Sequence, residues 1–283
     1  MLRPRAAATR AARCRRARRR RGRGGDGVRR RASIVVALGL IAGTREARAL
    51  DAFEIQVYDG TANAPGVFGL ELHSNAVANG VTTAEPPELP PNHQAHFTLE
   101  PSFGVTTWWE LGGYLQTAIR ADGTYDYAGV KLRSKFVTPP AWSKRVRFGA
   151  NFEVSDLPAR YEADRWGVEV RPIAAWDVAH LRLAVNPIID VPLTGGAVTF
   201  EPAAQALYEF PGAASFGVEY YAALGPVAGL APARDQQHYL FEVANLLAVR
   251  NLELNAGVGQ GLTSTSNALV IKVIVGYTFD RAR

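Results

Sequence analysis

The stretch NALVIKVIVGYTF (267–279) decides the fold, because its apolar residues alternate with other residues without a break. Successive side chains of a β-strand point to opposite faces. One face of this strand is therefore wholly apolar, formed by Leu269, Ile271, Val273, Val275, Tyr277 and Phe279. The stretch exceeds the five or six residues of an ordinary strand. It fits a transmembrane strand, which needs roughly nine to eleven tilted residues.

The same period-two alternation recurs along 66–279 and predicts twelve strands, and no segment shows a helical period. The predicted strands are 66–77, 94–103, 108–120, 124–137, 145–156, 165–177, 179–192, 197–210, 214–224, 237–248, 250–260 and 267–279. Longer connections alternate with tight ones, which is typical of outer-membrane barrels. The predicted fold class is all-β, a transmembrane antiparallel up-and-down β-barrel of about 12 strands within 66–283.

The spacing of two tryptophans allows the height of the predicted apolar band to be calculated. Trp166 and Trp176 fall on the same face of the predicted strand 165–177. Ten residues at about 3.3 Å each, tilted by about 40°, rise about 25 Å, which is the height of the apolar band between two aromatic girdles. The alternative is a β-sandwich whose core holds these aromatic residues, but sandwich strands are shorter.

Four prolines lie inside predicted strands, where each removes a hydrogen bond from the ladder. They are Pro101, Pro172, Pro187 and Pro202. A closed barrel has no edge strand that could accommodate them. We therefore expect a β-bulge at each of these positions.

The net charge of +6 combines two parts of opposite sign. Residues 1–49 hold 16 arginines, no lysine and two acidic residues, which leaves 16 basic and 24 acidic residues in 50–283, a net charge of −8. The pI of 9.6 therefore reflects the leader alone. A negatively charged body argues against nucleic acid as a partner.

Residues 1–49 are predicted to be an Arg-rich leader that ends in a secretory signal peptide. The charged region is 29–31, the apolar region is 33–42, and 47–49 predicts cleavage near Ala49. Ten residues are too few to span a bilayer, so an anchor helix is the weaker alternative. Whether residues 1–27 are translated stays open.

The inward faces of the predicted strands carry charges that segregate by sign. The basic residues are Arg120, Lys131, Arg133, Lys135, Arg145, Arg147, Arg171 and Arg182. The acidic residues are Glu201, Glu209, Glu219, Glu242 and Glu253. In a closed barrel the two sets form opposite walls of a pore and create a field across it. The alternative is that these charges pair across a narrow lumen and hold it closed.

Residues 50–65 precede the barrel and contain a short alternating stretch. Phe53, Ile55 and Val57 alternate there with polar residues. The segment is predicted either to lie inside the lumen as a plug or to be a disordered periplasmic start. Both alternatives, and the choice between an open and a plugged lumen, stay open at this level.

Enzymatic and metal chemistry find little support in the sequence. His73 and Ser74 are adjacent on a predicted strand and face opposite sides, so they cannot form a nucleophile–base pair. No G-x-S-x-G elbow is present. His93 and His96 lie near two glutamates with loose spacing, which is more typical of a solvated loop than of a metal site. The only cysteine, Cys14, lies in the leader. We therefore predict no enzyme, no cofactor and no metal site.

Four stretches resemble Gram-negative outer-membrane barrel proteins described as transporters or as meta-pathway phenol-degradation-like proteins. They are EIQVYD (54–59), PSFGVTTWWELG (101–112), VKLRSKF (130–136) and GYTF (276–279). The resemblance covers nearly all of 51–279. It implies the fold and an outer-membrane location and assigns no functional residue.

The predicted function is that of a passive channel or porin-like transporter for small solutes in the outer membrane. The expected partners are outer-membrane lipids, the barrel assembly machinery and an unidentified small solute. The alternatives are a structural or binding barrel that does not conduct and, less favoured, a barrel hydrolase. Neither the solute nor the oligomeric state can be read from the residues.

Overall fold

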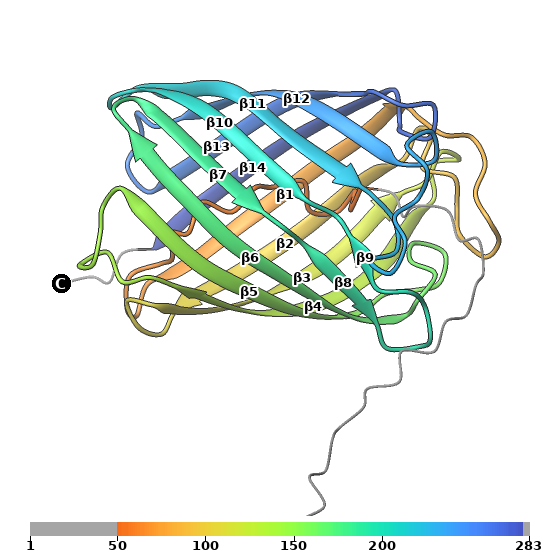
Figure 1. The fold of residues 1–283 in the computed structure, drawn as a ribbon, viewed down its shortest axis with the longest axis horizontal. Helices are drawn as coiled ribbons and strands as arrows, with labels where there is room; N and C mark the ends of the chain where they lie inside the picture. Colours follow the sequence, from red (N-terminus) through yellow and green to blue (C-terminus); the bar gives the residue numbers. More distant parts are fainter. Residues whose placement is uncertain (1–49, 280–283) are drawn as a thin grey trace, which may run out of the picture. The chain divides into compact units, whose positions relative to one another are not determined.

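The computed structural model describes residues 50–279, which contain strands, turns and loops. Within this range there is no apolar helix long enough to cross a membrane. The strands pair with antiparallel neighbours around a closed barrel, because β5 also pairs with β6 (Figure 1). They are β1 (Phe68–Asn79), β2 (Ala95–Gly104), β3 (Trp109–Ile119), β4 (Tyr125–Val137), β5 (Val146–Asp156), β6 (Trp166–Val178), β7 (Leu181–Asn186), β8 (Ile189–Pro192), β9 (Thr199–Phe200), β10 (Ala203–Phe210), β11 (Ala214–Ala223), β12 (Gln237–Leu246), β13 (Leu252–Gly261) and β14 (Leu269–Phe279).

The fourteen elements make twelve spans of the wall. Strands β7 and β8 are two halves of one span, and β9 and β10 are two halves of the next, as the pairing of both halves with the same neighbours shows. The predicted all-β barrel of twelve antiparallel strands is therefore confirmed. The two divided spans are interrupted only around Pro187 and Pro202.

The predicted bulges at the prolines are wrong. Ladder β1–β2 runs through Pro101 and ladder β5–β6 runs through Pro172 without a shift of register. In the register of β6 to β10, Pro172 lies opposite Pro187, and Pro187 lies opposite Pro202. The missing N–H donors of three neighbouring spans thus fall in one shared interruption, so no extra residue is needed. The register shifts occur elsewhere, between Val77 and Asn79 and opposite Ala128.

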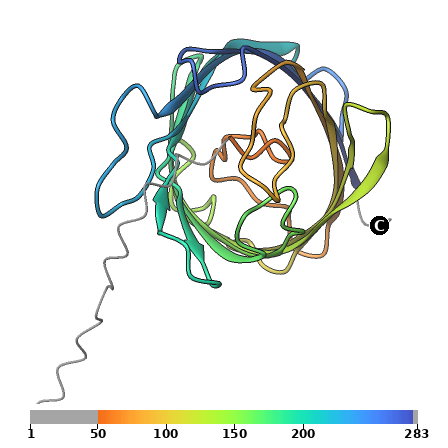
Figure 2. The same ribbon diagram turned by 90° about the vertical axis from the view of Figure 1, so that its right-hand side faces the viewer.

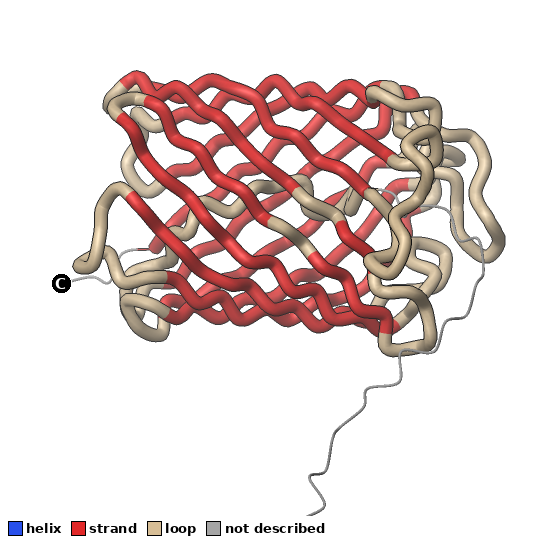
Figure 3. The backbone as a smooth tube through the Cα atoms, viewed as in Figure 1, coloured by secondary structure: helices blue, strands red, loops and turns tan. Residues whose placement is uncertain are grey.

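The two faces of the wall differ in polarity. Inward positions hold most of the buried polar and charged side chains of the strands. Outward positions are largely apolar and exposed, as the alternating burial along each strand shows. Figure 3 shows these strands as the wall of the barrel, with loops and turns at its two ends. Trp166 and Trp176 are both exposed on the outer face of β6, at its two ends. Large apolar side chains on the outer face include Leu72, Leu99, Leu115, Leu132, Val154 and Val258.

The two ends of the barrel differ in the length of their connections. One end, named here the long-loop end, carries loops 80–94, 120–124, 157–165, 193–198, 224–236 and 262–268. The other, named here the short-turn end, carries 105–108, 138–145, 179–180, 211–213 and 247–251. Figure 1 shows the long-loop end on the right. The predicted alternation of loop lengths is present, with 138–145 as the longest connection at the short-turn end.

Residues 50–65, named here the internal segment, run through the inside of the barrel (Figure 2). The backbone N–H of Leu50 donates to Gln237 Oε1 at the long-loop end of β12. The N–H of Gly66 donates to the carbonyl of Gly104 at the short-turn end. Of the two predicted placements of this segment, the structure shows the one inside the lumen. The predicted leader, residues 1–49, lies outside the described residues.

Candidate functional site in the barrel lumen

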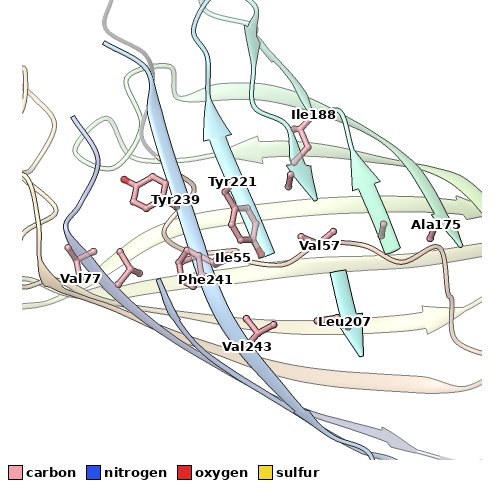
Figure 4. Packing of buried hydrophobic residues seen from close by; sticks show 13 residues of the cluster. Ile55, Val57, Val77, Ala175, Ile188, Leu207, Tyr221, Tyr239, Phe241 and Val243 are labelled. Atoms are coloured by element: carbon pink, nitrogen blue, oxygen red, sulfur yellow. The ribbon is translucent and has the colours of Figure 1, made fainter. Parts of the chain in front are cut away.

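The internal segment has an apolar face that packs on one side of the lumen. Ile55 and Val57 are buried in one cluster with Tyr221, Phe241 and other inward side chains (Figure 4). Most of these partners come from β10, β11 and β12. Their burial against the segment removes apolar surface from the aqueous interior, which favours the docked position. The alternation of 53–58 thus places its apolar residues against an apolar part of the wall.

The polar face of the segment meets the basic part of the wall. Arg171 Nη1 lies 3.1 Å from Glu54 Oε1, and Lys131 Nζ lies 2.7 Å from Asp51 Oδ2. Burial raises the pKa of Asp51, but the neighbouring Lys131 ammonium outweighs it, so the pKa of this carboxyl lies below its ordinary value. Burial of a charge is costly unless a partner compensates for it. The acidic residues of the segment therefore act as counter-charges for the wall.

Tyr58 bonds the wall through its N–H, its carbonyl and its hydroxyl. Its N–H donates to Asn186 Oδ1 at 2.7 Å, and its carbonyl accepts from Asn186 Nδ2 at 3.0 Å. Its hydroxyl lies 2.7 Å from the hydroxyl of Tyr114, which donates in turn to Glu153. The Arg171 guanidinium carbon lies 4.6 Å from its ring centroid, within the range of a cation–π contact. Tyr58 therefore joins the segment to several spans at once.

Toward the short-turn end the segment is bonded through both its backbone and its side chains. The carbonyl of Asp59 accepts from Arg147 Nε at 2.7 Å, and the N–H of Asn63 donates to Glu110 Oε2 at 2.6 Å. Arg182 Nη1 lies 3.3 Å from Asp59 Oδ2. Arg147 and Arg182 were predicted to face the lumen, and both contact the segment there.

The basic wall is paired with carboxylates of its own strands as well. Arg133 bonds Glu100 Oε1 through Nε at 2.7 Å and Glu110 Oε1 through Nη1 at 2.8 Å. Lys135 Nζ lies 2.9 Å from the same Glu110 oxygen. Lys131 Nζ lies 3.4 Å from Glu153 Oε2. These pairs compensate most of the positive charge that the sequence assigns to this wall.

The predicted acidic wall is only partly acidic. Glu219 accepts from Lys272 and from the hydroxyl of Tyr221, and Glu209 lies 3.5 Å from Arg182. Glu201 accepts from Thr199 at 2.9 Å. The charges of the lumen are therefore mostly paired, as in the predicted alternative of a narrow lumen held closed by ion pairs. They do not form two opposite walls of unpaired charge.

The inward placement of Glu242 is wrong. Glu242 is exposed and pairs in the ladders with Val218 and Val258, which lie on the outer face. The aromatic and β-branched residues on either side of it, Phe241 and Val243, are the ones that turn inward. The physical reason is that the lumen is apolar next to β12. The rule that charged residues of a barrel strand face inward therefore does not hold for this strand.

The remaining predicted residues lie near the ends of the barrel. Arg120 lies in the turn at the long-loop end and bonds Asp126. Arg145 is exposed in the 138–145 loop at the short-turn end. Glu253 lies on an inward position of β13 at the short-turn end, across Gly276 from β1. These three residues are at the mouths and outside the central network.

Strand parity places Glu100 and Asn186 on the inner face, and the structure agrees. Sequence reasoning did not single out other lumen residues of the central network, which are Tyr58, Tyr114, Tyr221, Phe241 and Lys272. Strand parity could have found Tyr114 and Lys272, since Lys272 occupies the polar face of 267–279. No local signal identifies Phe241, because an apolar residue on an alternating strand is ordinarily assigned to the lipid side.

The space left beside the internal segment is small. A cavity of about 30 Å³ is lined by residues of the segment together with Glu169, Arg171, Glu201 and Tyr221. That leaves room for about two or three water molecules. The internal segment and the inward side chains therefore fill most of this part of the lumen.

The histidines considered above as catalytic or metal-binding candidates are His73, His93 and His96. His73 and Ser74 lie on opposite faces of β1, as the ladder alternation requires, so they form no nucleophile–base pair. His96 is buried, bonds Gln94 Oε1 at 3.2 Å and packs edge-on against Phe53. His93 is exposed in the 80–94 loop. The described residues thus show no catalytic pairing at these positions.

Comparisons with known proteins agree with the architecture. No protein-family model matches the sequence, and no characterised protein sequence matches it. Among solved structures, the chain is similar to the KdgM porin, with 10% identity, a TM-score of 0.53, and coverage of 75% of this chain and 99% of that chain. It is also similar to an outer membrane channel from Pseudomonas putida F1, with 12% identity, a TM-score of 0.53, and coverage of 80% of this chain and all of that chain. At such identities the likeness shows the barrel fold alone.

Proposed function

We propose that the mature chain is a passive outer-membrane channel for small solutes, and that the internal segment narrows its lumen. The observation that carries the proposal is a wall with an apolar outside and a charged inside, closed on itself. A closed barrel pairs the backbone groups of neighbouring strands with one another and leaves no open edge, which the hydrocarbon region requires. Proteins of the same fold include a porin and an outer-membrane channel, which supports this assignment.

The orientation follows from the two ends. Bacterial barrels of this kind have short turns on the periplasmic side and longer loops outside. The long-loop end would then face the exterior, and the leader ending near Ala49 would direct export. The mature chain would begin at Leu50, whose N–H bonds Gln237 at the external end of the lumen.

The internal segment is held by contacts that water and ions can replace. Asp51, Glu54 and Asp59 supply three carboxylates to the basic wall, and the remaining bonds are mostly hydrogen bonds to side chains. The apolar contact rests chiefly on Ile55 and Val57. Such an interface can open on the timescale of local motions without disturbing the ladders of the wall. Conduction would follow displacement of the segment.

The charges suggest what passes when the segment moves. Displacement removes three carboxylates from the vicinity of Lys131, Arg171 and Arg182. Each of these cations keeps a carboxylate of the wall, so the change makes the lumen less negative by three charges. Fixed charges that line a pore favour solutes of the opposite sign. We therefore propose small anionic or polar solutes. The resemblance to phenol-degradation-like proteins stays a prediction, since no lumen residue singles out a phenolic solute.

Planar-bilayer recording tests the proposal. Purified mature protein, folded in detergent and free of other porins, should produce single-channel steps, with a current ratio that favours small anions. Protein denatured by heat is the matched control and should produce none. A complete absence of steps from folded protein would contradict the channel.

A second candidate is a structural or binding barrel that does not conduct. The cavity of only about 30 Å³ beside the segment favours it. This function requires the segment to stay docked, so folded protein would give no steps at any voltage that the bilayer tolerates. The same recording therefore separates the two candidates.

A further inference from the structure

Three inward side chains near the short-turn end converge on one point. His73 lies two residues after Glu71 on the inner face of β1, and Glu71 is the ladder partner of Glu100 on β2. His73 Nε2 is 3.1 Å from Glu100 Oε2 and 3.5 Å from Glu71 Oε2. One ligand atom from each residue lies within 4.8 Å of the other two.

The hydrogen bonds around this cluster leave one carboxylate oxygen without a donor. Arg133 binds Glu100 through Oε1, so Oε2 of Glu100 is turned to His73. Glu71 Oε2 is buried and accepts no hydrogen bond. A neutral imidazole carries a single N–H and can donate from Nε2 to one of the two carboxylates only. The cluster therefore lacks one positive partner.

The surrounding strands add negative charge. Gly276 of β14 lies between Glu71 and Glu253 of β13 in the ladders. A Cβ at this glycine would lie 2.9 Å from Glu71 Cγ and 3.3 Å from Glu253 Cβ, so both side chains lie close over the glycine. Three carboxylates thus follow one another across β2, β1, β14 and β13. Glu100 is buried, Glu71 is partly exposed and Glu253 is exposed, and carboxylates this close to one another favour a cation or a proton between them.

We infer that Glu71, His73 and Glu100 bind one divalent transition-metal ion such as Zn²⁺. Zn²⁺ takes imidazole nitrogen and carboxylate oxygen ligands at about 2.0–2.2 Å, which places neighbouring ligand atoms of a tetrahedral site about 3.3–3.6 Å apart. The distances from His73 Nε2 are close to that spacing. A mixture of one imidazole and two carboxylates disfavours soft Cu⁺ and hard Ca²⁺.

Glu71 is the one residue of the site with an appreciable exposed surface. His73 is fully buried, whereas the side chain of Glu71 is 22% exposed. With three protein ligands, the fourth position of the ion is left for water or a solute carboxylate. The bound ion also supplies the missing positive charge next to Glu253. The site joins β1 to β2 within the wall and is independent of whether the barrel conducts.

Equilibrium dialysis against Zn²⁺ followed by elemental analysis tests the inference. Untagged mature protein, folded in detergent and stripped with EDTA, should take up one Zn²⁺ per barrel. His73→Ala should abolish stoichiometric uptake, and the near-isosteric Glu71→Gln should weaken it at least about tenfold, as losses of metal-site partners do. His93→Ala and His180→Ala, at exposed positions, are matched controls and should bind like the unmodified chain.

Other outcomes contradict the site. Uptake well below one ion, or uptake unchanged in both His73→Ala and Glu71→Gln, would overturn it and leave a protonated imidazole as the partner of the carboxylates. Should His73→Ala fail to fold, as judged by electrophoresis of heated and unheated samples, Glu71→Gln decides alone. The absorption spectrum of Co²⁺ in the site gives a second readout, since mixed nitrogen and oxygen ligation is distinct from aqueous Co²⁺.

Discussion

At the scale of the residue, the lumen is a network of paired charges. Arg171 illustrates its design: it is fully buried, and it contacts two carboxylates, a backbone carbonyl and the ring of Tyr58. Removing one partner of such a pair leaves an uncompensated charge and is costly. Substitutions that test selectivity are therefore better placed where the remaining partner keeps a second bond.

Lys135 meets that condition. Its partner Glu110 keeps Arg133 and the N–H of Asn63, so Lys135→Gln should cost about 2 kcal/mol at most. The variant loses one lumen cation, and its channel should shift toward cation selectivity in reversal-potential measurements. Lys144→Gln, in the exposed 138–145 loop, removes the same charge outside the lumen and is the control. Equal reversal potentials for Lys135→Gln and the unmodified protein would mean that Lys135 does not line the conducting path.

At the scale of the element, the internal segment is the part that the sequence left undecided. The twelve wall strands follow from alternation alone, because the sequence of each strand by itself predicts which of its side chains face outward and which face inward. The position of 50–65 depends instead on non-local partners such as Asn186 and Lys272, which lie 128 and 217 residues away from the atoms they bond. The alternation within the segment shows only that one of its faces is apolar and does not identify the residues that it contacts.

A pair of cysteines should lock this element. A Cβ at Gly60 would lie 2.9 Å from Arg147 Cβ, closer than the 3.5–4.5 Å of a disulfide, and Gly60 has a φ of +77°, so the backbone of the segment must shift for the bond to form. The only natural cysteine, Cys14, lies ahead of the predicted cleavage site, so no other thiol competes. Gly60→Cys with Arg147→Cys should be silent when oxidised and conduct when reduced in the same bilayer. Gly60→Cys alone is the control, and conductance that ignores the redox state in the double variant would contradict displacement of the segment.

At the scale of the whole molecule, the closed wall and its apolar outside could be predicted, and the interior could only be predicted in part. The prolines show the reason. Pro172, Pro187 and Pro202 each look like a defect within their own strand, yet they share one interruption once the spans are side by side. Glu242 and Phe241 are a second example. Phe241 faces inward and Glu242 outward, opposite to the prediction, because Phe241 packs in the apolar cluster around Ile55. Both are properties of the assembled barrel.

The central claim is that the barrel wall forms a pore and that the internal segment fills it. The most direct test is the single-channel conductance of residues 66–283 compared with that of residues 50–283, which begin at the predicted cleavage site, with folding of both checked by electrophoresis of heated and unheated samples. We expect a larger conductance and a stronger preference for anions in the shorter chain, because Asp51, Glu54 and Asp59 leave the basic wall. Equal conductance and selectivity in the two folded proteins would contradict the claim.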